Sequence, residues 1–260
     1  MSSALVDLLS KIGRGYAEVT LVELFDVLDL PKTESSLAKV ILADKEMAEM
    51  GLQIIPPVSQ GELDSTRRII FVNSGLITAE TCRKELAGRE DDSLELKSSL
   101  VFDHKRASRE GGLPQSAFKS EEVVHSSLKT IAAFLTTAGG ILYIGVDDGG
   151  AILGIRSDFP CMTDNPQKQN ADGWELTLRG YIAGRFKDGA MVNDYVECTI
   201  LELDQCPIAR IKVAPRRQLS FVKQKGSDNY LLYRRQGNQT VLVSIDQVEE
   251  FLDLRRGLFG

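Results

Sequence analysis

Apolar residues recur at helical spacing along the first 51 residues and alternate with polar ones in two short stretches after them. Thr20 and Thr33 stand just before two of the helical stretches, where N-caps are typical, and Gly51 closes the last one. Three helices followed by a hairpin is the order of a winged helix, so residues 1–75 are predicted to form a winged-helix-like domain. The helices are expected at residues 4–12, 20–30 and 33–51, and the strands at residues 52–58 and 67–72.

The charge of this N-terminal part bears on how a winged helix would be used. Residues 1–73 contain seven basic and eleven acidic residues, a net charge of −4. The phosphate backbone of DNA repels such a surface. Contact with protein is therefore favoured, and recognition of DNA by the helix at residues 33–51 stays open as the alternative.

The pattern beyond residue 75 predicts a second domain of the α+β class over residues 89–260, joined to the first by a short helix at residues 76–88. Residues 94–97 (Leu-Glu-Leu-Lys) alternate as in a strand with one apolar and one polar face. Residues 104–119 lack periodicity and are predicted to be a loop. Helices are expected at residues 120–139, 174–186 and 245–256, and strands at residues 93–102, 141–148, 151–155, 196–203, 208–214, 220–224 and 229–235.

Composition and charge narrow the class of protein. The chain has 260 residues, of which 43% are hydrophobic and 26% are charged, the balance of an ordinary globular protein. Its net charge of −6 and its pI of about 5.2 argue against a broadly basic nucleic-acid coat protein. No apolar run approaches the roughly 18 residues that span a bilayer, and the first residues lack the pattern of a secretory signal, so a cytoplasmic location is expected.

The cysteines give the same indication about the compartment. Cys82, Cys161, Cys198 and Cys206 are widely scattered, and no pair forms C-x-x-C or another zinc-site spacing. They are therefore predicted to be thiols in a reducing environment.

Two adjacent aspartates, Asp147 and Asp148, follow an apolar strand and precede two glycines. No phosphate-binding loop of the type G-x-x-x-x-G-K-[ST] accompanies them, which excludes a P-loop ATPase. The four residues are typical of a hairpin turn. Alternatively, an aspartate contributes to a Mg²⁺ or Mn²⁺ site, which requires further carboxylates to converge on it. Glu90 and Glu95, with Lys97 two residues after the latter, are the candidates, and spacing alone does not decide.

Three blocks of sequence resemble the Alba-like domain of the Schlafen family. They are the spacing of Glu90, Glu95 and Lys97, the stretch AFLTTAGGILYIGVDDGG, and the tail at residues 229–251. The resemblance spans residues 89–252 and implies an α/β domain with a mixed sheet.

The same resemblance implies a metal site. Glu90, Glu95 and Asp148 correspond to three carboxylates that hold Mg²⁺ or Mn²⁺ in family members with ribonuclease activity, and Lys97 would contact the phosphate or orient the nucleophile. These four residues are therefore the expected catalytic residues.

Positive charge concentrates between Ala209 and Arg235, where eight basic residues accompany a single acidic one and two tyrosines interleave. Such a segment favours contact with phosphates. A set of solvated strand faces is the alternative interpretation. The residues expected to bind nucleic acid are Arg216, Arg217, Lys223, Lys225, Arg234 and Arg235.

These features leave three functional hypotheses. The first is a metal-dependent endonuclease that favours tRNA or other structured RNA, with a role in anti-phage defence that only the resemblance suggests. The second is a non-catalytic transcriptional regulator that binds DNA or RNA. The third is an interaction module of a larger complex. A homodimer is expected, because two copies would form a nucleic-acid groove that one lobe lacks, and partner proteins of a defence system are expected with it.

Overall fold

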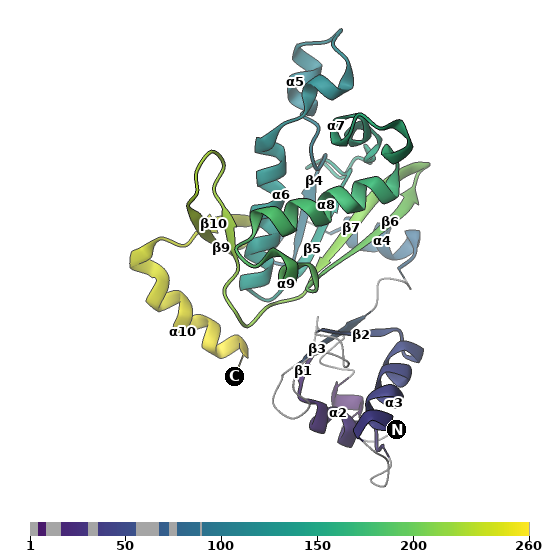
Figure 1. Ribbon diagram of the computed structural model, residues 1–260, viewed down its shortest axis with the longest axis vertical. Helices are drawn as coiled ribbons and strands as arrows, with labels where there is room; N and C mark the ends of the chain where they lie inside the picture. The colour runs from purple at the N-terminus through teal and green to yellow at the C-terminus, as the bar shows by residue number, and fades with distance from the viewer. Residues whose placement is uncertain are drawn as a thin grey trace. The chain divides into compact units, whose positions relative to one another are not determined.

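The computed structural model describes residues 5–8, 17–30, 36–55, 68–72, 77–88 and 90–259 (Figure 1). The chain divides into two compact units, residues 1–77 and 78–260. The helix expected at residues 76–88 is α4, Ala79–Leu86, and it is counted with the second unit. Among the described residues, no helix is both long and apolar enough to cross a membrane.

The N-terminal unit combines helices with a three-stranded antiparallel sheet of order β1-β3-β2. Thr20 caps α2, and Glu23 completes a capping box by accepting the Thr20 N–H at 2.6 Å. Strand β1 was not anticipated, the Thr33 cap lies outside the described residues, and the winged-helix class stays a prediction. The elements are β1 Ala17–Val19, α2 Leu21–Val27, α3 Ser36–Glu49, β2 Leu52–Ile55 and β3 Arg68–Val72.

The second unit is built on a mixed four-stranded sheet of order β4-β5-β7-β6, in which β4 and β5 are parallel and the other pairs are antiparallel. A smaller antiparallel sheet has the order β10-β9-β8. The expected strand at residues 151–155 does not form, since only an isolated bridge joins Val146 to Ile152. The strands are β4 Leu94–Lys97, β5 Gly140–Ile144, β6 Val196–Leu203, β7 Cys206–Val213, β8 Phe221–Lys223, β9 Tyr230–Gln236 and β10 Gln239–Leu242.

The helices of the second unit include two elements inside the segment expected to be a loop, α5 and η2. Asp103 begins α5, since its carboxylate accepts the N–H of Arg106 at 2.8 Å. The helices are α5 His104–Arg109, α6 Glu121–Thr136, α7 Phe159–Met162, α8 Ala171–Arg185, α9 Gly189–Asn193 and α10 Val248–Phe259, with 3₁₀ turns η2 Gln115–Phe118, η3 Arg156–Asp158, η4 Pro166–Lys168 and η5 Ile245–Gln247.

Alternation along β5 gives the sheet two different faces. Leu142 and Ile144 join the main hydrophobic core with apolar side chains of α6 and α8, and α8 lies across the strands in Figure 1. Tyr143 points to the opposite face, where its hydroxyl donates to Glu85 of α4 at 2.5 Å. Burial raises the pKa of Glu85, but hydrogen bonds from Arg210 and Tyr143 outweigh it and hold that pKa below its usual range. Helix α4 therefore covers the polar face of the sheet.

The paired glycines between α6 and β5 meet two separate steric demands. Gly139 has a φ of +80°, a left-handed conformation that favours glycine, in the turn that follows α6, and its N–H donates to the Phe134 carbonyl at 3.1 Å. Gly140 has ordinary backbone angles, but a Cβ there would lie 2.4 Å from the ring of Phe134, a side chain buried in the core. The second glycine is therefore required by close packing and not by its backbone conformation.

Gly140→Ala is expected to destabilise the second unit by about 1–3 kcal/mol, because the added methyl group overpacks against Phe134. Urea unfolding followed by circular dichroism measures the change. Gly180→Ala is the matched control: nothing lies within 4 Å of its added methyl group, so the better helix former should be neutral or stabilising in α8. Equal stability of Gly140→Ala and the wild type would contradict the packing argument.

Candidate functional site

Strand β4 has the two faces that the sequence predicts, but its polar face is covered. Leu94 and Leu96 are buried, and Glu95 on the other face is only 8% exposed. The Arg235 Nη1 lies 2.7 Å from one oxygen of Glu95, and the Lys97 ammonium contacts the other. Glu95 is therefore a buried carboxylate with both oxygens committed to cations.

Arg235 joins the two sheets of the second unit. Its guanidinium donates to the carbonyl of Asp91 at 2.6 Å and to the Thr240 hydroxyl at 3.1 Å, in addition to Glu95. It also stacks 5.1 Å from the centre of the Phe134 ring. Arg235 is 6% exposed, so the expectation that it lies on a nucleic-acid surface is corrected: it is an internal residue.

Glu90 folds back onto the strand that carries Glu95. Its carboxylate accepts the N–H of Leu96 at 2.7 Å. Asp91 beside it accepts the N–H groups of Ser93 and Leu94. Burial raises the pKa of Asp91, but hydrogen bonds from these residues outweigh it and leave that pKa lowered. Two of the three predicted metal ligands thus lie at β4.

Asp147 and Asp148 have different environments. Asp147 organises the turn after β5, since its carboxylate accepts the N–H groups of Gly149 at 2.9 Å and Ala151 at 2.8 Å. Asp148 is exposed and stands four residues beyond the end of β5, whereas Glu95 pairs with Leu142 within that strand. The expected turn is confirmed, and in the described part of the chain Asp148 forms no group with Glu90 and Glu95 that could hold a metal ion.

The predicted metal ligands are therefore not assembled in this arrangement. Within the described ranges, no three His, Cys, Asp or Glu side chains form a group that could hold a metal ion. The two oxygens of Glu95 face cations, which is the wrong environment for a further positive ion. A Mg²⁺ or Mn²⁺ site at Glu90, Glu95 and Asp148 stays a prediction from the resemblance.

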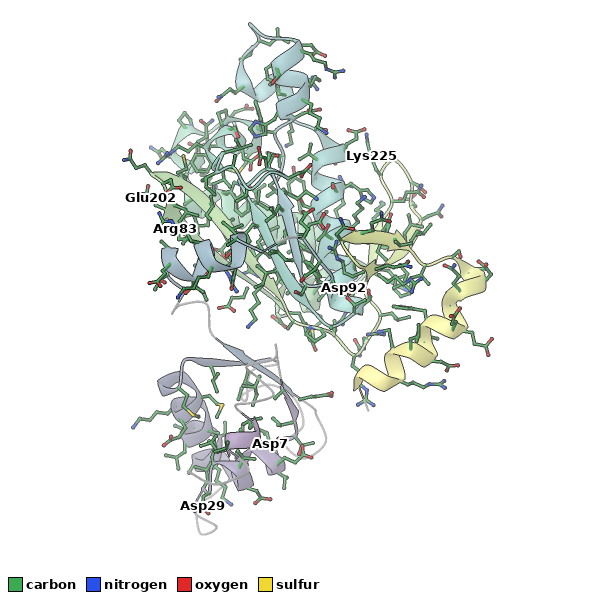
Figure 2. All side chains as sticks on the ribbon, turned by 180° about the vertical axis from the view of Figure 1, so that it is seen from behind. Asp7, Asp29, Arg83, Asp92, Glu202 and Lys225 are labelled. Carbon is green, nitrogen blue, oxygen red and sulfur yellow. The ribbon has the colours of Figure 1, made fainter. Side chains whose placement is uncertain are left out.

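The basic segment at residues 209–235 is largely neutralised by carboxylates, four of which come from other parts of the chain. Arg216 is the clearest correction: it is 3% exposed and pairs with Asp188 at 2.5 Å, so it does not lie on the surface. Figure 2 labels Lys225 on the turn between β8 and β9, where it pairs with Glu122 of α6. The five ion pairs are Arg210–Glu85, Arg216–Asp188, Lys223–Asp228, Lys225–Glu122 and Arg235–Glu95.

The other predicted contacts differ in exposure. Arg217 and Lys225 are exposed, whereas Lys223 and Arg234 are half-buried. The six residues therefore do not share one exposed face. The prediction used a count of charges along the sequence, and such a count does not reveal ion-pair partners that are distant in sequence.

Two groups of residues were missed by the sequence reasoning. Asp158 is a fully buried carboxylate that accepts hydrogen bonds from the segment following β4 and from Trp174. Lys105 and Arg109 on α5 are exposed cations in the segment that was expected to be a featureless loop. The available signal for the latter was Asp103 as an N-cap before a run of good helix formers.

Comparison with known proteins places most of the second unit in one family. The family model described as Schlafen, AlbA_2 matches residues 90–244. Among solved structures, the DIP2311 protein of Corynebacterium diphtheriae is 17% identical over 65% of this chain, with a TM-score of 0.41, and this chain spans 27% of its length. The N-terminal domain of a RecG-related protein from Nitrosomonas europaea is 19% identical over 62% of this chain and 90% of that domain, with a TM-score of 0.33. No curated protein matches the chain.

Proposed function

Because the chain belongs to the Schlafen AlbA_2 family, we propose that it binds nucleic acid, with RNA as the first candidate, and does not hydrolyse it in the arrangement described above. The family includes nucleic-acid-related proteins, which supports the general function. The pairing of Glu95 with both Arg235 and Lys97 is the main support for binding without hydrolysis.

The pairing matters because a metal site would need the same oxygens. A divalent ion would have to displace two cations from Glu95, and removing one partner of a buried pair is costly. Asp148 would also have to come together with Glu90 and Glu95, since the three form no metal-holding group as arranged. The carboxylates as arranged do not fit an ion, so binding is the better-supported function.

A metal-dependent endoribonuclease that uses Mg²⁺ or Mn²⁺ is the second candidate. One observation favours it: Glu90 folds back and accepts the N–H of Leu96, so two of the three expected ligands already lie at β4. This candidate requires a rearrangement that frees Glu95 and brings Asp148 closer. Homodimer formation and defence partners stay predictions from the sequence.

Incubation of the full chain with tRNA, single-stranded RNA and single-stranded DNA separates the two candidates. Binding to RNA that weakens as salt rises is expected, with no difference in RNA length between Mn²⁺ and EDTA. Asp148→Asn should bind RNA like the wild type. Cleavage that needs Mn²⁺ and is lost in Asp148→Asn would replace the binding proposal with the endonuclease, and absence of binding to every nucleic acid would overturn both.

A further inference from the structure

Residues 103–119 form an arm that leaves the second unit and returns to nearly the same place. Phe102 and Lys119 are bridge partners, and the N–H of Asp103 donates to the Phe118 carbonyl at 2.9 Å. The N–H of Ser120 then donates to the Val101 carbonyl at 2.9 Å. The arm contains α5 and η2, and Figure 1 shows α5 projecting beyond the end of the four-stranded sheet.

The inner side of the arm is fixed by packing. Phe118 is buried, and its ring lies 5.8 Å from that of Phe102 in an edge-on arrangement. The guanidinium of Arg106 lies 5.3 Å from the centre of the Phe118 ring and donates to the Ala117 carbonyl. Because these contacts hold the arm in one conformation, little conformational entropy is lost when a ligand binds to it.

The outer side of the arm has cations without acidic partners. Lys105, Arg109 and Lys119 are exposed, and among the described residues none of them forms an ion pair. Of the two acidic residues in the arm, Asp103 accepts the N–H of Arg106 as the N-cap of α5, and Glu110 pairs with the Arg106 side chain at 3.3 Å. This pattern is unlike that of residues 209–235, where most cations are matched by carboxylates. In a chain of net charge −6, unmatched cations on a projecting element mark a surface for an anionic partner.

We infer that the arm contacts the phosphate backbone of the bound nucleic acid through Lys105 and Arg109. The inference rests on the proposed function and assigns its surface to α5. The side chains are one turn of α5 apart, at positions i and i+4, and so lie on the same face of the helix. Such contacts give affinity without reading sequence, so they should act alike on RNA molecules of different sequence.

The test is a binding titration of single-stranded RNA at several salt concentrations with the Lys105→Ala/Arg109→Ala variant. Loss of two phosphate contacts should weaken binding roughly tenfold at low salt and reduce the slope of log K against log salt by about 1.4. Alanine favours helix, so α5 should persist, and circular dichroism should match that of the wild type.

The matched control is Arg83→Ala/Lys84→Ala, which removes the same charge from exposed positions on α4, where Figure 2 labels Arg83. This variant should keep the affinity and salt slope of the wild type. If the arm variant binds RNA as tightly as the wild type does, the inference is overturned and the proposed function stands. Equal losses of RNA affinity in both variants would show that only the net charge of the chain matters, and this would also overturn the inference about the arm. A wild type that binds no RNA would overturn both proposals.

Discussion

Asp158→Ala is expected to lower the free energy of unfolding by more than about 4 kcal/mol, a cost that is exceptional for one substitution. Asp158 is fully buried, and its carboxylate accepts the N–H groups of Leu100, Val101 and Phe102, each at 3.0 Å. It also accepts the Trp174 Nε1–H at 2.8 Å. Alanine would leave the Leu100 N–H and the Trp174 Nε1–H buried without an acceptor, and each such loss costs about 1–3 kcal/mol, whereas the N–H groups of Val101 and Phe102 would keep the Ser99 hydroxyl as an acceptor.

The measurement is urea unfolding followed by Trp fluorescence, which reports on the indole beside Asp158. Asp158→Asn should cost less, because it keeps one acceptor oxygen in the same shape. Asp164→Ala is the matched control, an exposed aspartate on a nearby segment whose loss should change stability by less than about 0.5 kcal/mol. An Asp158→Ala protein as stable as this control would show that water replaces the carboxylate.

Asp158 shows why part of the structure could not be predicted from the sequence. Its donors include residues 56 to 58 positions earlier in the chain, and no local pattern links them. By contrast, the Thr78 hydroxyl caps α4 by accepting the Thr81 N–H, a contact that the local sequence can indicate because a cap and its donor lie within one turn. The turn at Asp147 is local in the same sense.

The candidate site follows the same division between local and distant contacts. The alternation of Leu94 and Leu96 with Glu95 was predictable from four adjacent residues, and the family resemblance is confirmed by the match to residues 90–244. The burial of Glu95 was not predictable from the sequence, because its partner Arg235 is 140 residues away. Counting charge along residues 209–235 failed for that reason, since ion pairs form across the fold.

Arg235→Ala is expected to destabilise the second unit by about 3–5 kcal/mol, because it leaves Glu95 buried with one cation fewer. The change also removes the donors to Asp91 and Thr240 and the stacking on Phe134. Urea unfolding measures the loss. Arg234→Ala is the matched control at the next position, where the arginine is half-buried and makes one weak side-chain contact, to Gln236 at 3.4 Å. It should cost much less, within about 1 kcal/mol.

A double-mutant cycle with Glu95→Gln tests whether the two residues act as a pair. If they do, Arg235→Ala should cost less when Glu95 is already neutral, and the coupling should exceed about 1 kcal/mol. Additive effects would show that Arg235 acts through its other contacts. RNA binding separates structure from recognition: at a temperature where Arg235→Ala is folded, its affinity and salt slope should equal those of the wild type. A reduced slope in the folded variant would return Arg235 to the nucleic-acid surface, and the arm would then share that role with it.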